Sequence, residues 1–276
     1  MSTVIDRFLD APMLLTRWTS TALLCLCTSL SVAHAAPEIK GERTSVSLAQ
    51  TRIEAFRGSP EAQYNLAILY YNGDGLVRNR TKAAEWFTKS AKQGLDRAQY
   101  NLGALYFSGL GVNRDYKVAN TWFRLAAEQN YPPALYALGM SHYEGKGLSQ
   151  DRRKAAELLN RAAKRGSALA QNNLGLMYDQ GIGVPQDKGK AADWYEEAAD
   201  QGVVEAQFNL AQMYYAGEGV RQNRRKAARW FERAAEQGYA KAMSRLGDMY
   251  LTGDGVEQDI DRARTLYKQS GAAEQR

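Results

Sequence analysis

Apolar residues recur along the chain with the spacing of a helix. In the segment that begins at Ala62, apolar residues follow at Leu66, Leu69 and Tyr70, which are four, seven and eight positions further on. These positions fall on one face of an α-helix. A Gly-x-Gly triplet follows at residues 73–75. Because glycine accepts the left-handed conformation that a helix C-terminus needs, the pattern predicts that the helix ends at this triplet.

A second helix is predicted directly after this turn. Asn79 can accept hydrogen bonds from the free N–H groups at a helix start, and Ala83 and the aromatic pair Trp86-Phe87 follow with helical spacing. Gly94 then provides a second C-terminal signal. Each unit therefore consists of two helices, which are joined by a glycine-rich turn.

This unit is repeated six times at a constant interval of 36 residues. The Gly-x-Gly pairs lie at Gly73/Gly75, Gly109/Gly111, Gly145/Gly147, Gly181/Gly183, Gly217/Gly219 and Gly253/Gly255. We place the repeats at residues 62–97, 98–133, 134–169, 170–205, 206–241 and 242–276. One unit cannot bury its apolar face alone, so stacked units must supply the core, and the sequence predicts an all-α solenoid.

Residues 36–61 are predicted to hold a linker and, at Leu48–Arg57, a helix that caps the N-terminal end.

The recurring residues resemble a known repeat. Each unit follows Ala-Gln-Tyr-Asn-Leu-Ala-x-x-Tyr-x-x-Gly-x-Gly-Leu/Val and then Lys-Ala-Ala-x-Trp-Phe-x-x-Ala/Ser-Ala-x-Gln-Gly. This pattern resembles the Sel-one-like repeat, a subclass of the tetratricopeptide superfamily. The resemblance implies a right-handed superhelix whose first helices line the concave surface, and a non-catalytic adaptor or scaffold that binds other proteins. Exported bacterial members of the family include envelope regulators, exopolysaccharide-assembly factors and immunity proteins against type VI secreted lipases.

The first 35 residues have the pattern of a secretory signal peptide. Arg7 and Arg17 precede an apolar stretch at residues 21–32, and small residues at Ala33 and Ala35 form an A-x-A cleavage site. The apolar stretch is shorter than the roughly 20 residues that span a bilayer. We expect cleavage after Ala35 and a periplasmic protein. The alternatives are an N-terminal core helix and a translation start at Met13.

Composition narrows the chemistry that the chain can perform. Both cysteines of the 276-residue sequence, Cys25 and Cys27, lie in the predicted signal peptide, and His142 is the one histidine beyond it. We therefore expect no thiol–imidazole site, no multi-histidine zinc site and no cofactor. The formal net charge of +6 does not require a nucleic-acid partner. An enzyme acting on peptidoglycan or β-lactams is a remote alternative, because no nucleophile with a base is apparent.

Aromatic residues on the first helices are the predicted protein-binding surface. Rows of tyrosine combine apolar area with a hydrogen-bonding tip, which is typical of interface hot spots. The predicted binding residues are Tyr64, Tyr71, Tyr100, Phe107, Tyr136, Tyr143, Asp179, Phe208 and Tyr215. The alternative is that some of these rings pack between units. Asn65, Asn101, Asn173 and Asn209 run beside them and could bond either a partner or neighbouring helices.

Two further features leave alternatives open. His142 replaces a recurrent tyrosine and is either a hydrogen-bonded core residue or a pH sensor. Basic clusters stand near the start of the second helices and belong either to a solvated outer face or to an anion-binding site: Arg78-Asn79-Arg80, Arg152-Arg153-Lys154 and Arg224-Arg225-Lys226.

The sequence thus predicts a periplasmic protein-binding scaffold. Its most specific form is an immunity protein that neutralises a type VI secreted lipase or phospholipase through its concave face. The alternative is an envelope regulator or an exopolysaccharide-assembly adaptor. In each case the expected partner is another protein, with no nucleic acid and no membrane span.

Overall fold

The structure is a computed structural model that describes residues 47–273 of the chain. The chain divides into two units, Met1–Ile39 and Lys40–Arg276, and all the described residues belong to the second. The signal peptide predicted at residues 1–35 and the start of the predicted linker lie outside the described residues.

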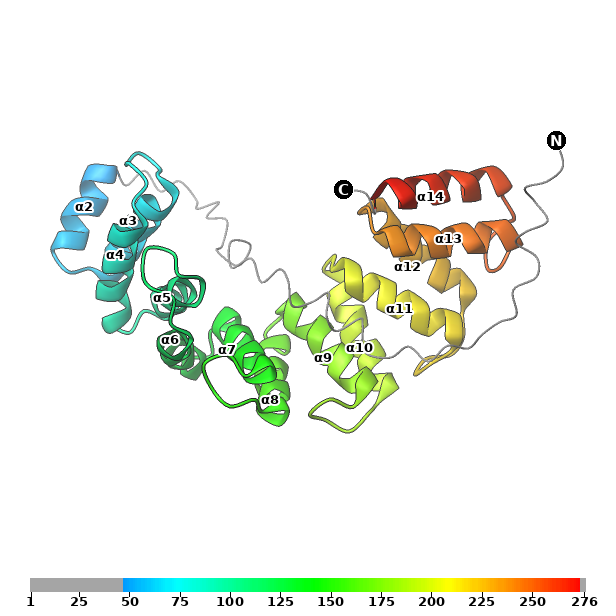
Figure 1. The fold of residues 1–276 in the computed structure, drawn as a ribbon, viewed down its shortest axis with the longest axis horizontal. Helices are drawn as coiled ribbons and strands as arrows, with labels where there is room; N and C mark the ends of the chain where they lie inside the picture. Colours follow the sequence, from blue (N-terminus) through cyan, green and yellow to red (C-terminus); the bar gives the residue numbers. More distant parts are fainter. Residues whose placement is uncertain (1–46, 274–276) are drawn as a thin grey trace. The chain divides into compact units, whose positions relative to one another are not determined.

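The described residues form helices and no strand, which confirms the all-α solenoid (Figure 1). The helix predicted at Leu48–Arg57 is α2 (Leu48–Phe56). The first helices of the six repeats are α3 (Pro60–Asn72), α5 (Asp96–Ser108), α7 (Pro132–Glu144), α9 (Ala168–Gln180), α11 (Val204–Ala216) and α13 (Ala240–Thr252). The second helices are α4 (Arg80–Lys92), α6 (Tyr116–Glu128), α8 (Arg152–Ala163), α10 (Lys188–Asp200), α12 (Arg224–Glu236) and α14 (Ile260–Ala273).

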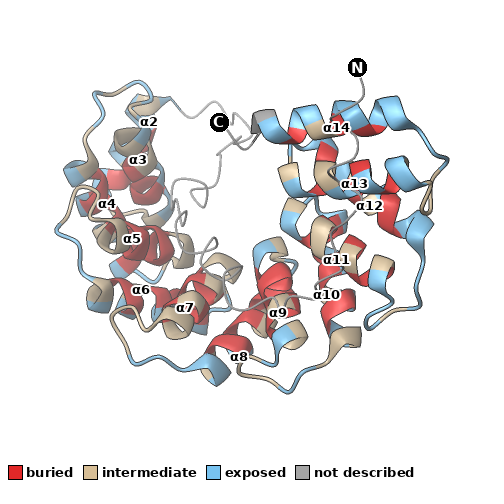
Figure 2. Ribbon diagram, turned by 45° about the vertical axis from the view of Figure 1, so that its right-hand side comes forward, coloured by how far each residue is buried: buried red, intermediate tan, exposed pale blue. Residues whose placement is uncertain are grey.

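Each helix packs on its neighbours in sequence, first within a repeat and then onto the next repeat. α2 packs on α3 as a second helix would. Within the described unit the first helices line the inner side of a curve and the second helices its outer side, and the buried residues lie between the two layers (Figure 2). We call the exposed surface of α3, α5, α7, α9, α11 and α13 the first-helix face.

The predicted helix ends are confirmed in their geometry. Gly73 has a φ of 89°, and its N–H donates to the carbonyl oxygen of Leu69. Asn79 accepts from the N–H of Lys82 at 2.9 Å, which satisfies a free donor at the start of α4. Asn130 replaces glycine at one second-helix end and adopts the same left-handed conformation, with a φ of 63°.

The core repeats with the sequence. A leucine from every first helix is at most 7% exposed, at Leu66, Leu102, Leu138, Leu174, Leu210 and Leu246. Five second helices place a large side chain against it, each at most 2% exposed, at Phe87, Phe123, Leu159, Tyr195 and Phe231. The layers can approach closely because the residue after each leucine is glycine or alanine.

A ladder of glutamine pairs, each with one buried and one exposed member, joins consecutive repeats. Gln63 Nε2 donates to the carbonyl oxygen of Ala55 at 3.2 Å, and Gln93 Nε2 donates to Gln63 Oε1 at 2.7 Å. The same two bonds recur at Gln99/Gln129, Gln171/Gln201 and Gln207/Gln237. A buried carbonyl that lacks a partner would cost about 1 to 3 kcal/mol, so the ladder stabilises each junction.

The third repeat satisfies the same carbonyl in another way. Leu135 stands where the other ladder positions have glutamine. Arg161, from α8, donates instead to the carbonyl oxygen of Ala127 at 3.1 Å and to Asn130 Oδ1 at 2.8 Å. The departure in sequence therefore preserves the hydrogen bond at the junction.

The second glycine of each turn is the contact point between repeats. Gly183 has a φ of +70°, and a Cβ atom there would lie 2.1 Å from the carbonyl oxygen of Arg152, at the start of α8. Gly75 has a similar φ of +68°, but a Cβ there would meet only a Leu48 methyl group at 3.6 Å. An alanine at either site would have a strained left-handed backbone. Of these two sites, only Gly183 would also bring its Cβ atom into collision with a neighbouring backbone.

We expect Gly183→Ala to lower the free energy of unfolding much more than Gly75→Ala does. Both variants carry the strain of about 1 to 2 kcal/mol for a left-handed alanine. Gly183→Ala adds a backbone collision, which brings the expected loss to about 3 kcal/mol or more. Urea denaturation followed by circular dichroism measures both. Equal losses would show that the turn does not touch the preceding repeat.

A second matched pair tests the close approach of the helices within a repeat. A Cβ at Gly103 would lie 2.7 Å from the Phe123 ring and 3.0 Å from the carbonyl oxygen of Ala119. At Gly139 the nearest atom is Leu159 Cγ at 3.2 Å, because leucine replaces the ring.

We expect Gly103→Ala to reduce the free energy of unfolding by about 1 to 2 kcal/mol. The cost of displacing the rigid Phe123 ring exceeds the gain from the higher helix propensity of alanine. Gly139→Ala should be neutral within about 0.5 kcal/mol, because the leucine can move and alanine favours the helix by about 1 kcal/mol. Thermal and urea unfolding of both variants give the comparison. A stabilised Gly103→Ala variant would contradict the packing described.

Candidate protein-binding face

The predicted binding residues lie in two rows on the first helices. The first row occupies the position of Tyr64 and consists of Tyr64, Tyr100, Tyr136 and Phe208. The second row lies seven residues, or two helical turns, further along each helix. It consists of Tyr71, Phe107, Tyr143, Asp179 and Tyr215. The structure places the two rows in different surroundings.

Tyr64 and Tyr100 of the first row belong to the core, whereas Tyr136 and Phe208 are half-buried. Tyr64 and Tyr100 are each 4% exposed. The Tyr64 ring contacts Phe87 at a centroid distance of 5.6 Å, and the Tyr100 ring contacts Phe123 at 5.7 Å. Phe208 is half-buried and packs against Phe231 in the same way, at 5.6 Å. The prediction that this row faces a partner is therefore corrected for Tyr64 and Tyr100, whose area is already used between helices.

Two hydroxyl groups of this row, those of Tyr64 and Tyr136, are bonded within the protein. Asn101 Nδ2 donates to the Tyr64 hydroxyl at 3.3 Å, and Asn173 Nδ2 donates to the Tyr136 hydroxyl at 3.2 Å. Burial raises the pKa of Tyr136, and the bond from Asn173 opposes that shift. Of the two roles considered for the asparagines, bonding between neighbouring repeats is the one that Asn101 and Asn173 perform.

The second row is half-buried and borders solvent. Each of its positions lies nine residues before the first residue of the second helix, and three of these residues supply a cation. Arg80 lies over the Tyr71 ring at 5.8 Å, and Arg224 lies over the Tyr215 ring at 5.0 Å. Such contacts hold an aromatic ring in place while one of its faces stays available.

The other members of the second row differ in chemistry. Phe107 contacts the Tyr116 ring at 4.9 Å, and Lys146 lies over it at 5.6 Å. Asp179 forms an ion pair with Lys188 at 3.6 Å. Tyr143 is half-buried at the middle repeat. The row is therefore aromatic in the first, second, third and fifth repeats and acidic in the fourth.

Electrostatic contacts fix the row near the C-terminal end of the array. The Tyr215 hydroxyl donates to Asp254 Oδ2 at 2.9 Å, and Arg224 forms an ion pair with the same carboxylate. The Arg224 guanidinium holds the pKa of Asp254 below its usual range, although burial opposes this shift. Beside this cluster a hollow between α11 and α13 is lined by Gln212, Tyr215, Phe231, Arg245, Asp248 and Met249.

His142 is half-buried in the third repeat. Burial lowers its pKa, Asp151 raises it, and Lys154 lowers it further. The Nδ1 atom is buried without a hydrogen-bond partner. The lowered pKa favours the neutral form of the imidazole.

Residues 47–273 contain no group of three His, Cys, Asp or Glu side chains that could hold a metal ion. No helix of that range has the length and the apolar character needed to cross a bilayer.

Sequence reasoning missed the residues that support the second row. Arg80, Lys188 and Arg224 recur with the period of 36, but the residue type at this position varies, so no pattern marks them. The period of 36 places this position nine residues after the second-row residue in every repeat. That constant spacing was the signal that could have found the supporting residues.

A known repeat family matches the chain with the same period of 36 residues. The model of the Sel1 repeat matches residues 60–95, 96–131, 132–167, 168–203, 204–239 and 240–274. These bounds start two residues before the repeats placed from the sequence, where the first helices begin. No curated protein matches the sequence.

Two solved structures are similar along most of the chain. One is a protective antigen of uropathogenic Escherichia coli with an SLR fold, 36% identical, with a TM-score of 0.80. The match covers 82% of this chain and 49% of that one, so the chain spans about half the length of the antigen. The other is a Sel1 repeat protein from Oxalobacter formigenes, 32% identical, with a TM-score of 0.69 and coverage of 81% and 87%.

An immunity protein from Pseudomonas aeruginosa is a more distant match. It is 22% identical, with a TM-score of 0.46 and coverage of 78% of this chain and 81% of that one, and its function does not carry over at this distance. Six matched repeats in one phase cover the chain from residue 60 to residue 274, and the chain belongs to the Sel1 repeat family.

Proposed function

We propose that the chain is an exported scaffold that binds another protein through the second row of the first-helix face. The observation that carries this proposal is the half-buried row at Tyr71, Phe107 and Tyr215, whose rings are held by neighbouring side chains and border solvent. Fixed aromatic residues lose little conformational entropy when a partner binds, so they are effective anchors. A rigid array of repeats presents them at regular intervals.

The most specific form of the proposal is an immunity protein. In this form the partner is a type VI secreted lipase or phospholipase, and the scaffold masks its active site in the periplasm. An apolar, aromatic surface suits such a partner, because lipases expose apolar surface around the entrance for their substrate. An envelope regulator or an exopolysaccharide-assembly adaptor would use the same face for a different protein, so the identity of the partner separates the two.

We expect the double variant Tyr71→Ala/Tyr215→Ala to lose its partner without unfolding. Each substitution removes a hot-spot ring, and one such ring typically contributes 2 kcal/mol or more to binding, so affinity should fall by at least about 30-fold. The measurement is capture of the partner from extracts of the native host by C-terminally tagged chain, with mass spectrometry and then titration of the purified partner.

Leu125→Ala is the matched control, because Leu125 is 37% exposed on α6, a second helix. It should capture the partner as the unchanged chain does. Loss of capture in the control alone would place the interface on the second helices and overturn the proposal. A captured protein without lipase chemistry, such as a sensor or polysaccharide-export component, would replace the immunity form by the regulator form.

Export is tested separately. Residues 1–35 should be absent from the protein isolated from the periplasmic fraction, and its N-terminal residue should be Ala36, as intact-mass spectrometry or N-terminal sequencing would show. Replacing Ala33 and Ala35 by a large residue should leave the leader attached. Recovery of full-length chain in the cytoplasm would contradict export.

A further inference from the structure

A continuous edge of the array carries cations along the first three repeats. We define the basic edge as Arg78, Arg80, Lys82, Arg114, Lys117, Arg152 and Arg153. The turns of consecutive repeats pack on one another here. A Cβ at Gly111 would lie 2.4 Å from the backbone of Arg80, and a Cβ at Gly147 would lie 2.5 Å from that of Tyr116. The turn that holds Arg114 therefore lies against the start of α4.

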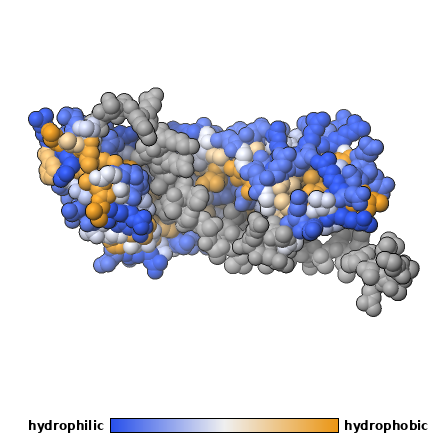
Figure 3. All heavy atoms as spheres, turned by 90° about the horizontal axis from the view of Figure 1, so that it is seen from above, coloured by the Kyte–Doolittle hydropathy of each residue, from blue (hydrophilic) through white to orange (hydrophobic). Residues whose placement is uncertain are grey.

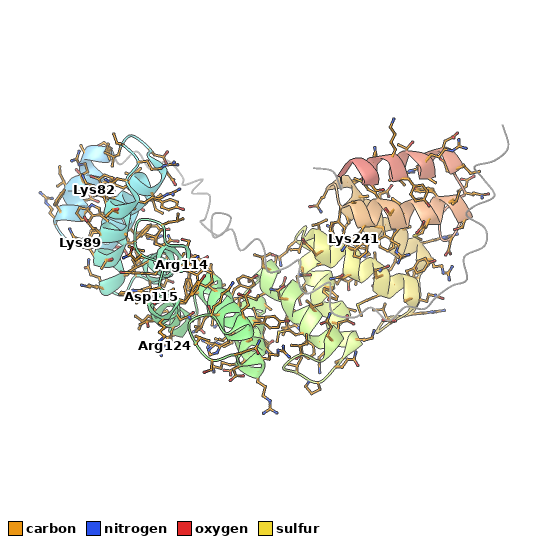
Figure 4. The ribbon with its side chains drawn as sticks, viewed as in Figure 1. Lys82, Lys89, Arg114, Asp115, Arg124 and Lys241 are labelled. Carbon is orange, nitrogen blue, oxygen red and sulfur yellow. The ribbon has the colours of Figure 1, made fainter. Side chains whose placement is uncertain are left out.

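None of these cations forms an ion pair with a described carboxylate. Asp115, which Figure 4 shows beside Arg114, accepts instead from the N–H groups of Lys117 and Val118 as the cap of α6. The later repeats differ. There Lys188 pairs with Glu218, Arg224 with Asp254 and Arg262 with Glu232. Part of the positive charge is thus neutralised in the later repeats, whereas no cation of the basic edge has a carboxylate partner among the described residues.

One turn position changes residue type at the basic edge. In repeats three to six this position is glutamine, whose Nε2 donates to a carbonyl oxygen seven residues before it. The four glutamines are Gln150, Gln186, Gln222 and Gln258. In the first two repeats it is Arg78 and Arg114, which are exposed. Arginine has replaced a residue that closes the turn with a hydrogen bond.

The cations also oppose the local electrostatics of the helices. α4, α6 and α8 have no acidic residue in the first turn, and the basic edge places positive side chains there. A helix N-terminus carries partial positive charge, so cations at this end are unfavourable. Arg80, Lys82 and Arg114 gain contacts with the ring faces of Tyr71, Tyr70 and Tyr116. These contacts provide no counter-ion, which an external anion would supply.

We propose that the basic edge binds an anionic lipid surface. The cations are spread along three repeats and do not converge on one point, which suits many phosphate headgroups better than a single anion. Next to Arg78, Val77 is 90% exposed, and an apolar side chain at the tip of a basic turn can enter the headgroup layer. The proposed partner-binding face lies on the first helices and meets the basic edge at Arg80, which lies over the Tyr71 ring.

Binding to vesicles tests the proposal. The full chain is mixed with vesicles of 30% phosphatidylglycerol in phosphatidylcholine and, in parallel, with phosphatidylcholine alone, and sedimentation gives the partition coefficient. Each cation near an anionic surface contributes about 5-fold. We expect clear preference for the anionic vesicles, and a loss of at least about 10-fold when salt rises from 0.05 to 0.5 M, because the screening length falls to a few ångströms.

The variant Arg78→Gln/Arg114→Gln removes two charges and restores the glutamine that the other repeats use, so it should fold. Partition into anionic vesicles should fall by about 25-fold. The control Arg225→Gln/Arg229→Gln removes two exposed, unpaired arginines of the fifth repeat. It should change partition by less than about 2-fold, and so should Tyr215→Ala, because the Tyr215 ring contacts Arg224 and no cation of the basic edge.

Three results would overturn the proposal. These are equal binding to neutral and anionic vesicles, equal losses in both arginine variants, and full displacement from vesicles by micromolar polyglutamate with no effect of lipid charge. The last would identify an acidic protein segment as the ligand. If millimolar inorganic phosphate displaced the chain from anionic vesicles at constant ionic strength, the basic edge would be a site for free phosphate and not for a lipid surface.

Discussion

The contact between each turn and the preceding second helix sets the geometry of the array. Because glycine has no side chain, each turn can lie against the backbone at the start of the second helix of the preceding repeat. Gly183, for example, lies against Arg152, the first residue of α8. Because this contact is backbone against backbone, it does not depend on the side chains at the junction. Side chains are therefore free to vary at the start of the second helices. This freedom gives the chain both the cations that hold the second row and the unpaired cations of the basic edge.

The sequence was sufficient for the period, the pair of helices in each repeat and the residues that end and cap them, because these are local properties. It placed the repeat starts two residues after the first helices begin. It was insufficient for separating the two aromatic rows. Tyr64 and Tyr71 are seven residues apart and lie on the same side of α3, so periodicity assigns them one environment. Their surroundings differ along the helix axis. Near the start of the helix Tyr64 meets Phe87 and Asn101, whereas near its end Tyr71 meets Arg80. Only the packing of three helices decides which ring stays accessible.

The third repeat shows that a junction can change its residues and keep its bonds. Leu135 and Arg165 stand where other junctions have a glutamine pair, and Arg161 donates to the carbonyl oxygen of Ala127 instead. Leu159 replaces a ring, and Gly139 gains space. These changes compensate one another, so a sequence that departs from the repeat consensus does not by itself mark a functional site. His142 in the same repeat has a buried Nδ1 without a partner, and no compensating residue accompanies it.

Charge is divided between the two layers of helices. The first helices contain three basic and six acidic residues, and the second helices contain 20 basic and ten acidic ones. Hydrophobic residues form separate patches among hydrophilic ones on the face that Figure 3 shows. A scaffold with an aromatic, slightly acidic inner layer and a basic outer layer can bind two ligands of different chemistry at once. If one is a protein and the other a lipid surface, the rigid contact at each glycine turn fixes the distance at which the first is held from the second.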